Sequence, residues 1–190
     1  MSYPPAPWFT HGHAFVAPYL VRVADLRLPE GLEVVNPGRF TVGLLSYVVY
    51  EAPSPLQYDE LIWMPAFVRD RRCGPGAKGW YVSVMYVNDG TTLAAGREIW
   101  KLPKTLATFD RSVDEVRGDG GAGTSLALRV KAFGPTKTLR ASTTTLQAND
   151  GKTRVRFRAS FKADVSPGSM SLTRFDTRHP PFMGLAGARR

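Results

Sequence analysis

The sequence contains very little cysteine and no long apolar run. Cys73 is the only cysteine among 190 residues, so no disulfide can form within the chain and a structural zinc site is not expected. No apolar run approaches the roughly 20 residues that cross a bilayer. The N-terminus lacks a basic segment followed by an apolar core, which argues against a secretory signal. We therefore expect a cytoplasmic protein with no membrane partner.

Motifs for binding nucleic acid or metal are also missing. The net charge of +9 is compatible with an anionic partner. No zinc-finger spacing or RNP-type aromatic motif is present, so we expect no nucleic-acid partner. His11 and His13 would share one face of a strand. No third ligand accompanies them, so we expect no metal site.

What the sequence does contain is the pattern of one mainly β domain. Hydrophobic residues make up 43% and charged residues 22%, as in soluble globular proteins, and the length suits a single domain over 1–190. The Pro-rich segment 1–7 is expected to be mobile. Period-two alternation predicts strands at 19–23, 39–50, 80–87, 125–131, 138–146 and 153–161.

Turns and short helices separate these strands. Asn88-Asp89-Gly90 and Asn149-Asp150-Gly151 are turn signals, and the second predicts a hairpin. We expect a short helix over 92–100 and a weaker one over 23–28. Strands at this spacing favour a barrel or a sandwich.

One lysine follows a proline inside an apolar segment. Lys104 comes directly after Pro103, with Ile99, Trp100 and Leu102 nearby. A free lysine has a pKa of about 10.4, and burial in an apolar pocket lowers the pKa of a lysine until its amine becomes a nucleophile. Lys104 is therefore a candidate nucleophile. A surface lysine after a turn proline is the ordinary alternative.

The segment around this lysine resembles the hallmark of the acetoacetate decarboxylase family. That hallmark is Gly-Arg-Glu, a short spacer and Pro-Lys, here Gly96-Arg97-Glu98 and Pro103-Lys104. Tyr58-Asp59-Glu60 resembles the family's Tyr-x-Glu segment, and further likeness lies at 28–33, 79–81 and 85–87. The resemblance implies a mainly β fold, a cone-shaped antiparallel β-barrel with a few short helices. It also implies a homo-oligomer that acts on a small-molecule keto acid without a cofactor.

The resemblance assigns chemistry to two residues. Lys104 would form a Schiff base with a ketone, and the resulting iminium would delocalise a carbanion as an enamine. Glu60 would transfer protons or orient the substrate, with an exposed carboxylate at a strand end as the alternative. A dry wall beside the lysine would be built by Met85, Trp100 and Leu102.

Three further residues are expected to support this site. His13 aligns near an arginine with which the family places the substrate carboxylate, so it is a candidate substrate contact. Arg97 and Glu98 are expected to act as a structural pair that supports the lysine segment.

The chain also departs from the family pattern. Thr105 stands where the decarboxylases carry a second lysine, and Lys101 is the candidate replacement. Decarboxylation of a 3-keto acid and aldol, dehydration or cyclisation chemistry through the same iminium, as in relatives from secondary metabolism, are therefore both open. The alternative function is a non-catalytic barrel that binds a small anion or a protein partner.

A basic segment in the C-terminal part of the chain has no role in the lysine chemistry described above. Lys152, Arg154, Arg156 and Arg158 would share one face of a strand. We expect a solvated outer face, with anion binding or a subunit contact as the alternative.

Overall fold

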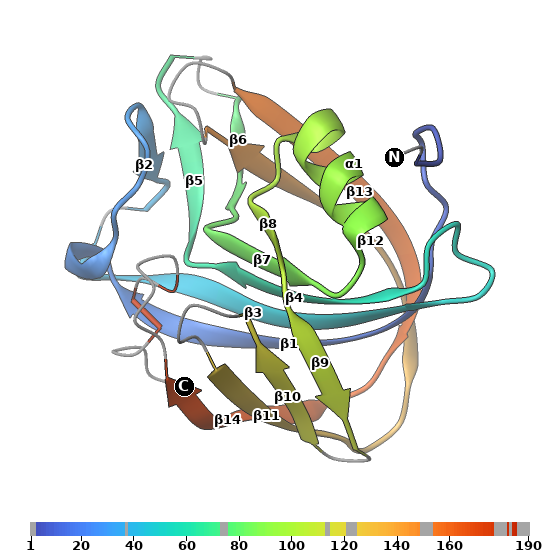
Figure 1. Ribbon diagram of the computed structural model, residues 1–190. Helices are drawn as coiled ribbons and strands as arrows, with labels where there is room; N and C mark the ends of the chain where they lie inside the picture. Colours follow the sequence, from blue (N-terminus) through green and yellow to red (C-terminus); the bar gives the residue numbers. More distant parts are fainter. Residues whose placement is uncertain are drawn as a thin grey trace.

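The computed structural model describes residues 3–36, 38–72, 76–112, 115–120, 125–148, 154–176, 182 and 184–185. Within these residues the chain forms fourteen strands, one α-helix and one 3-10 turn, η1 (Val23–Asp25) (Figure 1). The prediction of a mainly β chain is confirmed. The helix does not have the length and apolar character needed to cross a bilayer, and no other helix is found in the described residues.

The strand that contains the candidate lysine belongs to sheet 1. Its strands, in spatial order, are β1 (His11–Arg22), β3 (Phe40–Glu51), β4 (Tyr58–Met64), β7 (Val84–Val87) and β8 (Lys104–Leu106). Neighbours are antiparallel except β7 and β8, which run parallel with Met85 opposite Lys104. The register between β4 and β7 places Glu60 opposite Val87.

Two further sheets complete the architecture. Sheet 2 contains, in spatial order, β13 (Val155–Val165), β12 (Lys137–Gln147), β6 (Lys78–Tyr81), β5 (Ala66–Asp70) and β2 (Leu32–Val34). Sheet 3 contains β14 (Gly168–Asp176), β11 (Ser125–Ala132), β10 (Glu115–Asp119) and β9 (Thr108–Arg111).

The barrel prediction is not confirmed. Within the described residues the strands pair into three separate sheets, and β1 and β8 remain the edges of sheet 1. Two of the strand pairs, β7 with β8 and β12 with β6, are parallel, so the pairing is not wholly antiparallel. The sequence signals of alternation specify strands and their faces, but not how the sheet edges meet.

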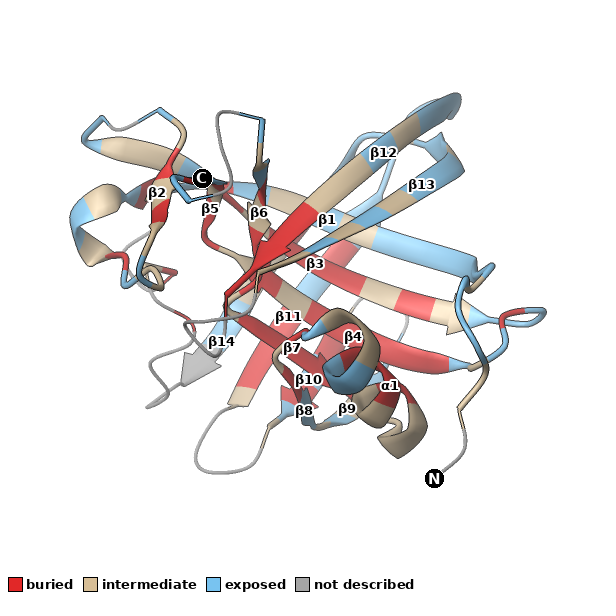
Figure 2. Cartoon of the chain, turned by 90° about the horizontal axis from the view of Figure 1, so that it is seen from above, coloured by how far each residue is buried: buried red, intermediate tan, exposed pale blue. Residues whose placement is uncertain are grey.

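Alternation gives sheet 1 two buried faces. One face packs into the large core of the molecule and includes Tyr47, Leu61 and Trp63. The other carries a smaller apolar cluster with Tyr58 and Met85 at its centre. The two clusters account for the buried centres of β4 and β7, whereas the outer parts of β1 and β13 are exposed (Figure 2).

The helix α1 (Gly90–Trp100) covers the second face of sheet 1 and packs against β7 and β8 (Figure 1). The turn signal Asn88-Asp89-Gly90 begins this helix. Asp89 has extended backbone geometry and its side chain accepts from the Thr92 N–H at 2.7 Å, which is the arrangement of an N-cap. Its position therefore fixes the first turn of α1.

Candidate active site

Lys104 is buried, with 2% of its surface exposed. The helix ends at Trp100 because Lys101 adopts the left-handed conformation, φ 53°. The Leu102 N–H then donates to the Gly96 carbonyl at 3.0 Å, which turns the chain back along the helix. These bonds direct the lysine side chain under α1 rather than into solvent. A surface lysine is therefore excluded.

Three side chains contact the Lys104 amine. Nζ lies 2.9 Å from Glu60 Oε2 and 2.7 Å from Thr92 Oγ1. It also lies 3.5 Å from the Tyr58 hydroxyl and 4.9 Å from the centre of the Tyr58 ring. The amine is thus enclosed by one carboxylate, two hydroxyls and an aromatic face.

Glu60 is 3% exposed and comes from the centre of β4. Its second oxygen, Oε1, accepts from the Tyr50 hydroxyl at 3.3 Å. The rings of Tyr50 and Tyr58 lie side by side, with centroids 4.5 Å apart. Each carboxylate oxygen of Glu60 therefore has a polar partner, as a buried charge requires.

The two tyrosines beside this carboxylate remain protonated. Burial raises the pKa of both the Tyr50 and Tyr58 phenols, and the negative charge of Glu60 raises each pKa further. They therefore act as neutral hydroxyl groups around the Lys104–Glu60 pair.

Thr92 was not identified from the sequence. It has no exposed surface and lies in the first turn of α1, where Asp89 caps its backbone N–H. The neighbouring Asn88 Oδ1 accepts from the Asp59 N–H at 2.8 Å, so the start of the helix is tied to β4 beside Glu60. Helix and strand thus hold Thr92 and Glu60 around the same amine.

The predicted apolar wall has two buried members and one partly buried member. Met85 and Leu102 are 5% and 6% exposed and belong to the small cluster with Tyr58. Trp100 lies at the edge of this cluster. Its ring packs against Trp8, with centroids 4.9 Å apart, and against Phe157, at 5.4 Å.

Arg97 and Glu98 contact different partners rather than each other. Arg97 Nε donates to the Lys104 carbonyl at 2.8 Å and so fixes the backbone that carries the lysine. Glu98 accepts from the Tyr3 hydroxyl at 2.5 Å. The N-terminal segment thereby contacts the last turns of α1.

The structure does not bring His13 to the lysine. His13 lies on β1, opposite Val49, whose side chain belongs to the large core on the other face of sheet 1. Cross-strand partners share a face, so His13 lies on the face away from Lys104. Its nearest charged partner is the Glu51 carboxylate, at 3.5 Å.

The structure also places the two positions at which the chain departs from the family pattern. Lys101 is exposed at the end of α1, and Thr105 is exposed on β8. Thr105 carries no charge, and Lys101 is exposed whereas Lys104 is buried. No group of three His, Cys, Asp or Glu side chains in the described part of the chain is arranged to hold a metal ion.

Fold and site together are those of a mainly β protein with a buried lysine–glutamate pair beneath one helix. A family model described as acetoacetate decarboxylase (ADC) matches residues 1–179. The chain belongs to the acetoacetate decarboxylase family.

A curated relative and several solved structures are similar to the chain. Acetoacetate decarboxylase from Ralstonia nicotianae is 32% identical over 114 residues, which is 56% of this chain but only 41% of the relative. The crystal structure of acetoacetate decarboxylase from Legionella pneumophila shares 18% identity, a TM-score of 0.52, and 90% and 75% coverage of the two chains. For the enduracididine biosynthesis enzyme MppR complexed with pyruvate, the values are 15%, 0.56, 94% and 81%. At these identities the two structures establish the fold.

Proposed function

We propose that the chain is an enzyme that forms a Schiff base between Lys104 and a small keto acid. The observation that carries this proposal is the pairing of a buried amine with a buried carboxylate at 2.9 Å. Family membership supports it, as does the presence of pyruvate in the complex of the similar MppR structure.

The first step requires a neutral amine, and Glu60 is placed to provide it. A proton passes from Lys104 Nζ to Glu60 Oε2 along the 2.9 Å contact, which leaves a lone pair on the nitrogen and a neutral pair in the apolar site. The lone pair attacks the carbonyl carbon of the substrate, a C–N bond forms, and Glu60 returns its proton to the former carbonyl oxygen. A second proton passes from the nitrogen to this oxygen, which leaves as water and gives the iminium.

The iminium serves as the electron sink for the next step. In a 3-keto acid the bond to the carboxylate breaks, carbon dioxide leaves, and the electron pair enters the enamine. In a 2-keto acid such as pyruvate, loss of a proton from C3 gives an enamine that adds to a second carbonyl. Glu60, a carboxylate again once water has formed, accepts the proton that C3 of a 2-keto acid loses.

Thr92, Tyr58 and Tyr50 position these groups. Thr92 Oγ1 accepts from the amine at 2.7 Å and keeps Nζ beside Glu60. The neutral Tyr58 hydroxyl lies 3.5 Å from Nζ and donates a hydrogen bond to the oxygen that leaves as water. Tyr50 donates to Glu60 and fixes the orientation of its carboxylate. Met85 and Leu102 keep bulk water away from the iminium.

Access to the amine requires movement, because Lys104 is only 2% exposed. The groups that cover it lie on α1 and on β4. Substrate therefore reaches Nζ only when these side chains separate, and Met85, Trp100 and Leu102 line the space that opens. Assembly as a homo-oligomer and a cytoplasmic location stay predictions.

Turnover assays on acetoacetate and pyruvate test this function and separate its two reactions. Release of carbon dioxide from acetoacetate, abolished in Lys104→Met, identifies a decarboxylase. Consumption of pyruvate together with an aldehyde, without release of carbon dioxide, identifies carbon–carbon addition. A Lys104→Met variant as active as the unmodified chain would refute the proposal for either reaction.

A further inference from the structure

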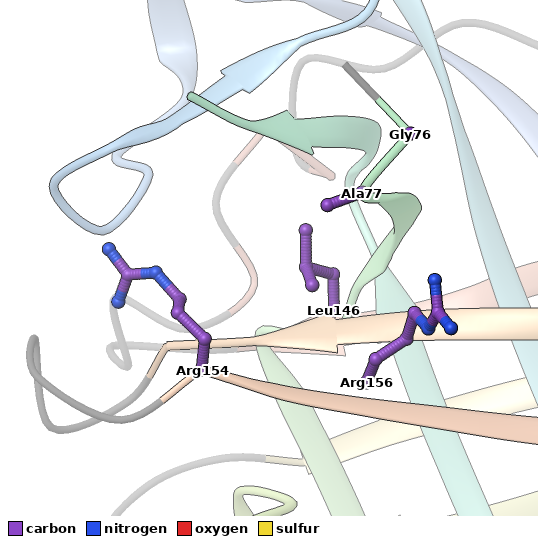
Figure 3. Close-up of a pocket in the computed structure, with 5 residues that line it drawn as sticks. All are labelled: Gly76, Ala77, Leu146, Arg154 and Arg156. Atoms are coloured by element: carbon purple, nitrogen blue, oxygen red, sulfur yellow. The ribbon is translucent and has the colours of Figure 1, made fainter. Parts of the chain in front are cut away.

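A pocket lies on sheet 2, apart from the lysine site. It has a volume of about 390 Å³ and is lined by Gly76, Ala77, Leu146, Arg154 and Arg156. The Leu146 and Ala77 side chains lie between the two arginines (Figure 3). This volume is in the range of pockets that hold small molecules. None of the five lining residues takes part in the proposed chemistry.

Arg154 is a fixed part of the wall of this pocket. Its Nε donates to Asp70 Oδ2 at 2.8 Å, and the Asp70 side chain has no exposed surface. Its Nη2 donates to the Glu30 carbonyl, so both ends of the guanidinium are held. The side chain of Arg154 is 11% exposed. The prediction of a solvated face is therefore wrong at this position.

The acidic side chains around this end of sheet 2 are already engaged. Three carboxylates are paired with four arginines: Glu30 with Arg72, Glu33 with Arg69 and Arg71, and Asp70 with Arg154. Arg156 is exposed, and within the described residues it has no hydrogen bond or ion pair. Among the residues that the structure describes, the pocket therefore presents one guanidinium that pairs with no carboxylate.

Arg156 lies beside Leu146 at one end of the pocket (Figure 3). It is the cross-strand partner of Leu146 in the β12–β13 pairing, so the two side chains share a face. A guanidinium offers two parallel N–H groups that match the two oxygens of a carboxylate. Leu146, which is only 2% exposed, forms the bottom of the pocket, and the half-buried Ala77 offers apolar contact to whatever is attached to that carboxylate. The lining thus combines one anion-binding fork with a small apolar floor.

We propose that this pocket binds a small organic carboxylate with a short aliphatic chain. The carboxylate pairs with Arg156, and the chain lies against Ala77 above the buried Leu146. The site is separate from the lysine site, because the next residue, Phe157, points to the opposite face of β13 and packs on Trp100. The proposal therefore stands whether or not Lys104 forms a Schiff base.

Titration with hexanoate, followed by NMR of isotopically labelled leucine methyl groups, tests the site in the full chain. The Leu146 methyl signals are expected to shift with saturation. In Arg156→Ala the dissociation constant is expected to rise at least about tenfold, because a charge-assisted hydrogen bond is lost. Hexan-1-ol has a chain of the same length without the charge. It is expected to bind the unmodified protein as weakly as hexanoate binds Arg156→Ala.

Arg158→Ala is the matched control, because Arg158 is an exposed arginine on the same strand and the same face but does not line the pocket. It is expected to bind hexanoate like the unmodified chain. Arg156→Lys keeps the charge without the fork and is expected to bind with intermediate affinity. Equal affinities for Arg156→Ala and Arg158→Ala, or saturation without a shift of Leu146, would overturn the proposal.

Discussion

The side chain of Lys104 lies against the backbone of Gly96. A β-carbon on Gly96 would lie 2.5 Å from Lys104 Cδ and 2.6 Å from Lys104 Cε, well inside van der Waals contact. The aliphatic stem of the lysine therefore runs across the bare backbone of α1. Glycine is needed at position 96 because the Lys104 side chain occupies the space that a β-carbon there would fill.

Replacement of this glycine is expected to impair the site more than the fold. In Gly96→Ala the lysine stem must shift, and Nζ leaves its positions beside Glu60 and Thr92. Alanine favours a helix interior over glycine by about 1 kcal/mol, which offsets part of the crowding. We expect trapping of the keto acid on Lys104 to fall at least about tenfold, whereas the free energy of unfolding changes by no more than about 2 kcal/mol.

Gly90→Ala is the control for this variant, since Gly90 begins the same helix and an added β-carbon there meets nothing within 4 Å. It should trap as much keto acid as the unmodified chain. Equal trapping by both alanine variants would mean that the close contact at Gly96 does not position the amine.

Glu60→Gln is expected to slow Schiff-base formation. The amide keeps the shape of the carboxylate but cannot take the proton from Nζ, and general acid–base groups contribute about 10²–10⁴-fold to rates. Glu51→Gln, an exposed position on the adjacent strand β3, should leave the rate unchanged. Single-turnover trapping with pyruvate measures both variants. A Glu60→Gln rate within a factor of about two of the unmodified rate would exclude Glu60 as the proton acceptor.

The ion pair between Lys104 and Glu60 is also expected to affect the stability of the fold. Lys104→Met leaves the buried Glu60 carboxylate without its cation, which is expected to cost about 3–5 kcal/mol. In the double variant Lys104→Met/Glu60→Gln both charges are absent, so the loss should be smaller than the sum of the single losses. Urea unfolding measures all three. Strict additivity would show that the pair contributes no coupling energy.

Thr92 offers a conservative test of amine positioning. Thr92→Val replaces the hydroxyl by a methyl group of similar size and removes the 2.7 Å contact to Nζ. We expect it to lower kcat with little change in KM, because the lost contact orients the lysine rather than the substrate. Thr92→Ser keeps the hydroxyl and should restore most of the activity. A serine variant as impaired as the valine variant would assign Thr92 a packing role alone.

Alkaline pH should destabilise the fold through its buried phenols. Burial raises the pKa of Tyr47 and Tyr58, and the carboxylates of Asp59 and Glu60 add to the effect. The folded chain therefore keeps protons that the unfolded chain releases above about pH 10. The free energy of unfolding is thus expected to be constant just below pH 10 and to fall as the pH rises further.

Tyr47→Phe removes one of these protons and should flatten the decline by up to about 1.4 kcal/mol per pH unit. Urea unfolding at a series of pH values gives the free energy of unfolding. Tyrosinate absorbance, recorded in parallel, gives the ionisation of the phenols. An unchanged slope would show that Tyr47 does not contribute.

Much of the secondary structure could be predicted from alternation. The strands expected at 39–50, 125–131 and 138–146 correspond to β3, β11 and β12. The strand expected at 80–87 is two strands, β6 and β7, which belong to different sheets. Alternation does not reveal where a strand leaves one sheet for another. The hairpin expected at Asn149-Asp150-Gly151 lies outside the described residues, although β12 and β13, on either side of it, pair antiparallel.

The contacts within the candidate site could be predicted in part from the sequence. The likeness around Lys104 and Glu60 pointed to two residues that prove to be in contact, although they lie far apart in the sequence. Thr92 gave no signal, because a threonine in the first turn of a helix is ordinary and its contact with Lys104 depends on how α1 packs on β8. His13 lies on the wrong face because strand faces alternate with every residue, so alignment by likeness alone does not determine the face.

The Schiff-base role of Lys104 is tested by finding the residue that a keto acid modifies. The chain is incubated with pyruvate or acetoacetate, reduced with borohydride, digested, and mapped by mass spectrometry, with Lys101→Met as a control for the neighbouring exposed lysine. We predict one reduced adduct on Lys104, retained in Lys101→Met and absent in Lys104→Met. An adduct on other lysines alone, or none with either acid, would contradict the central claim that Lys104 is the Schiff-base residue.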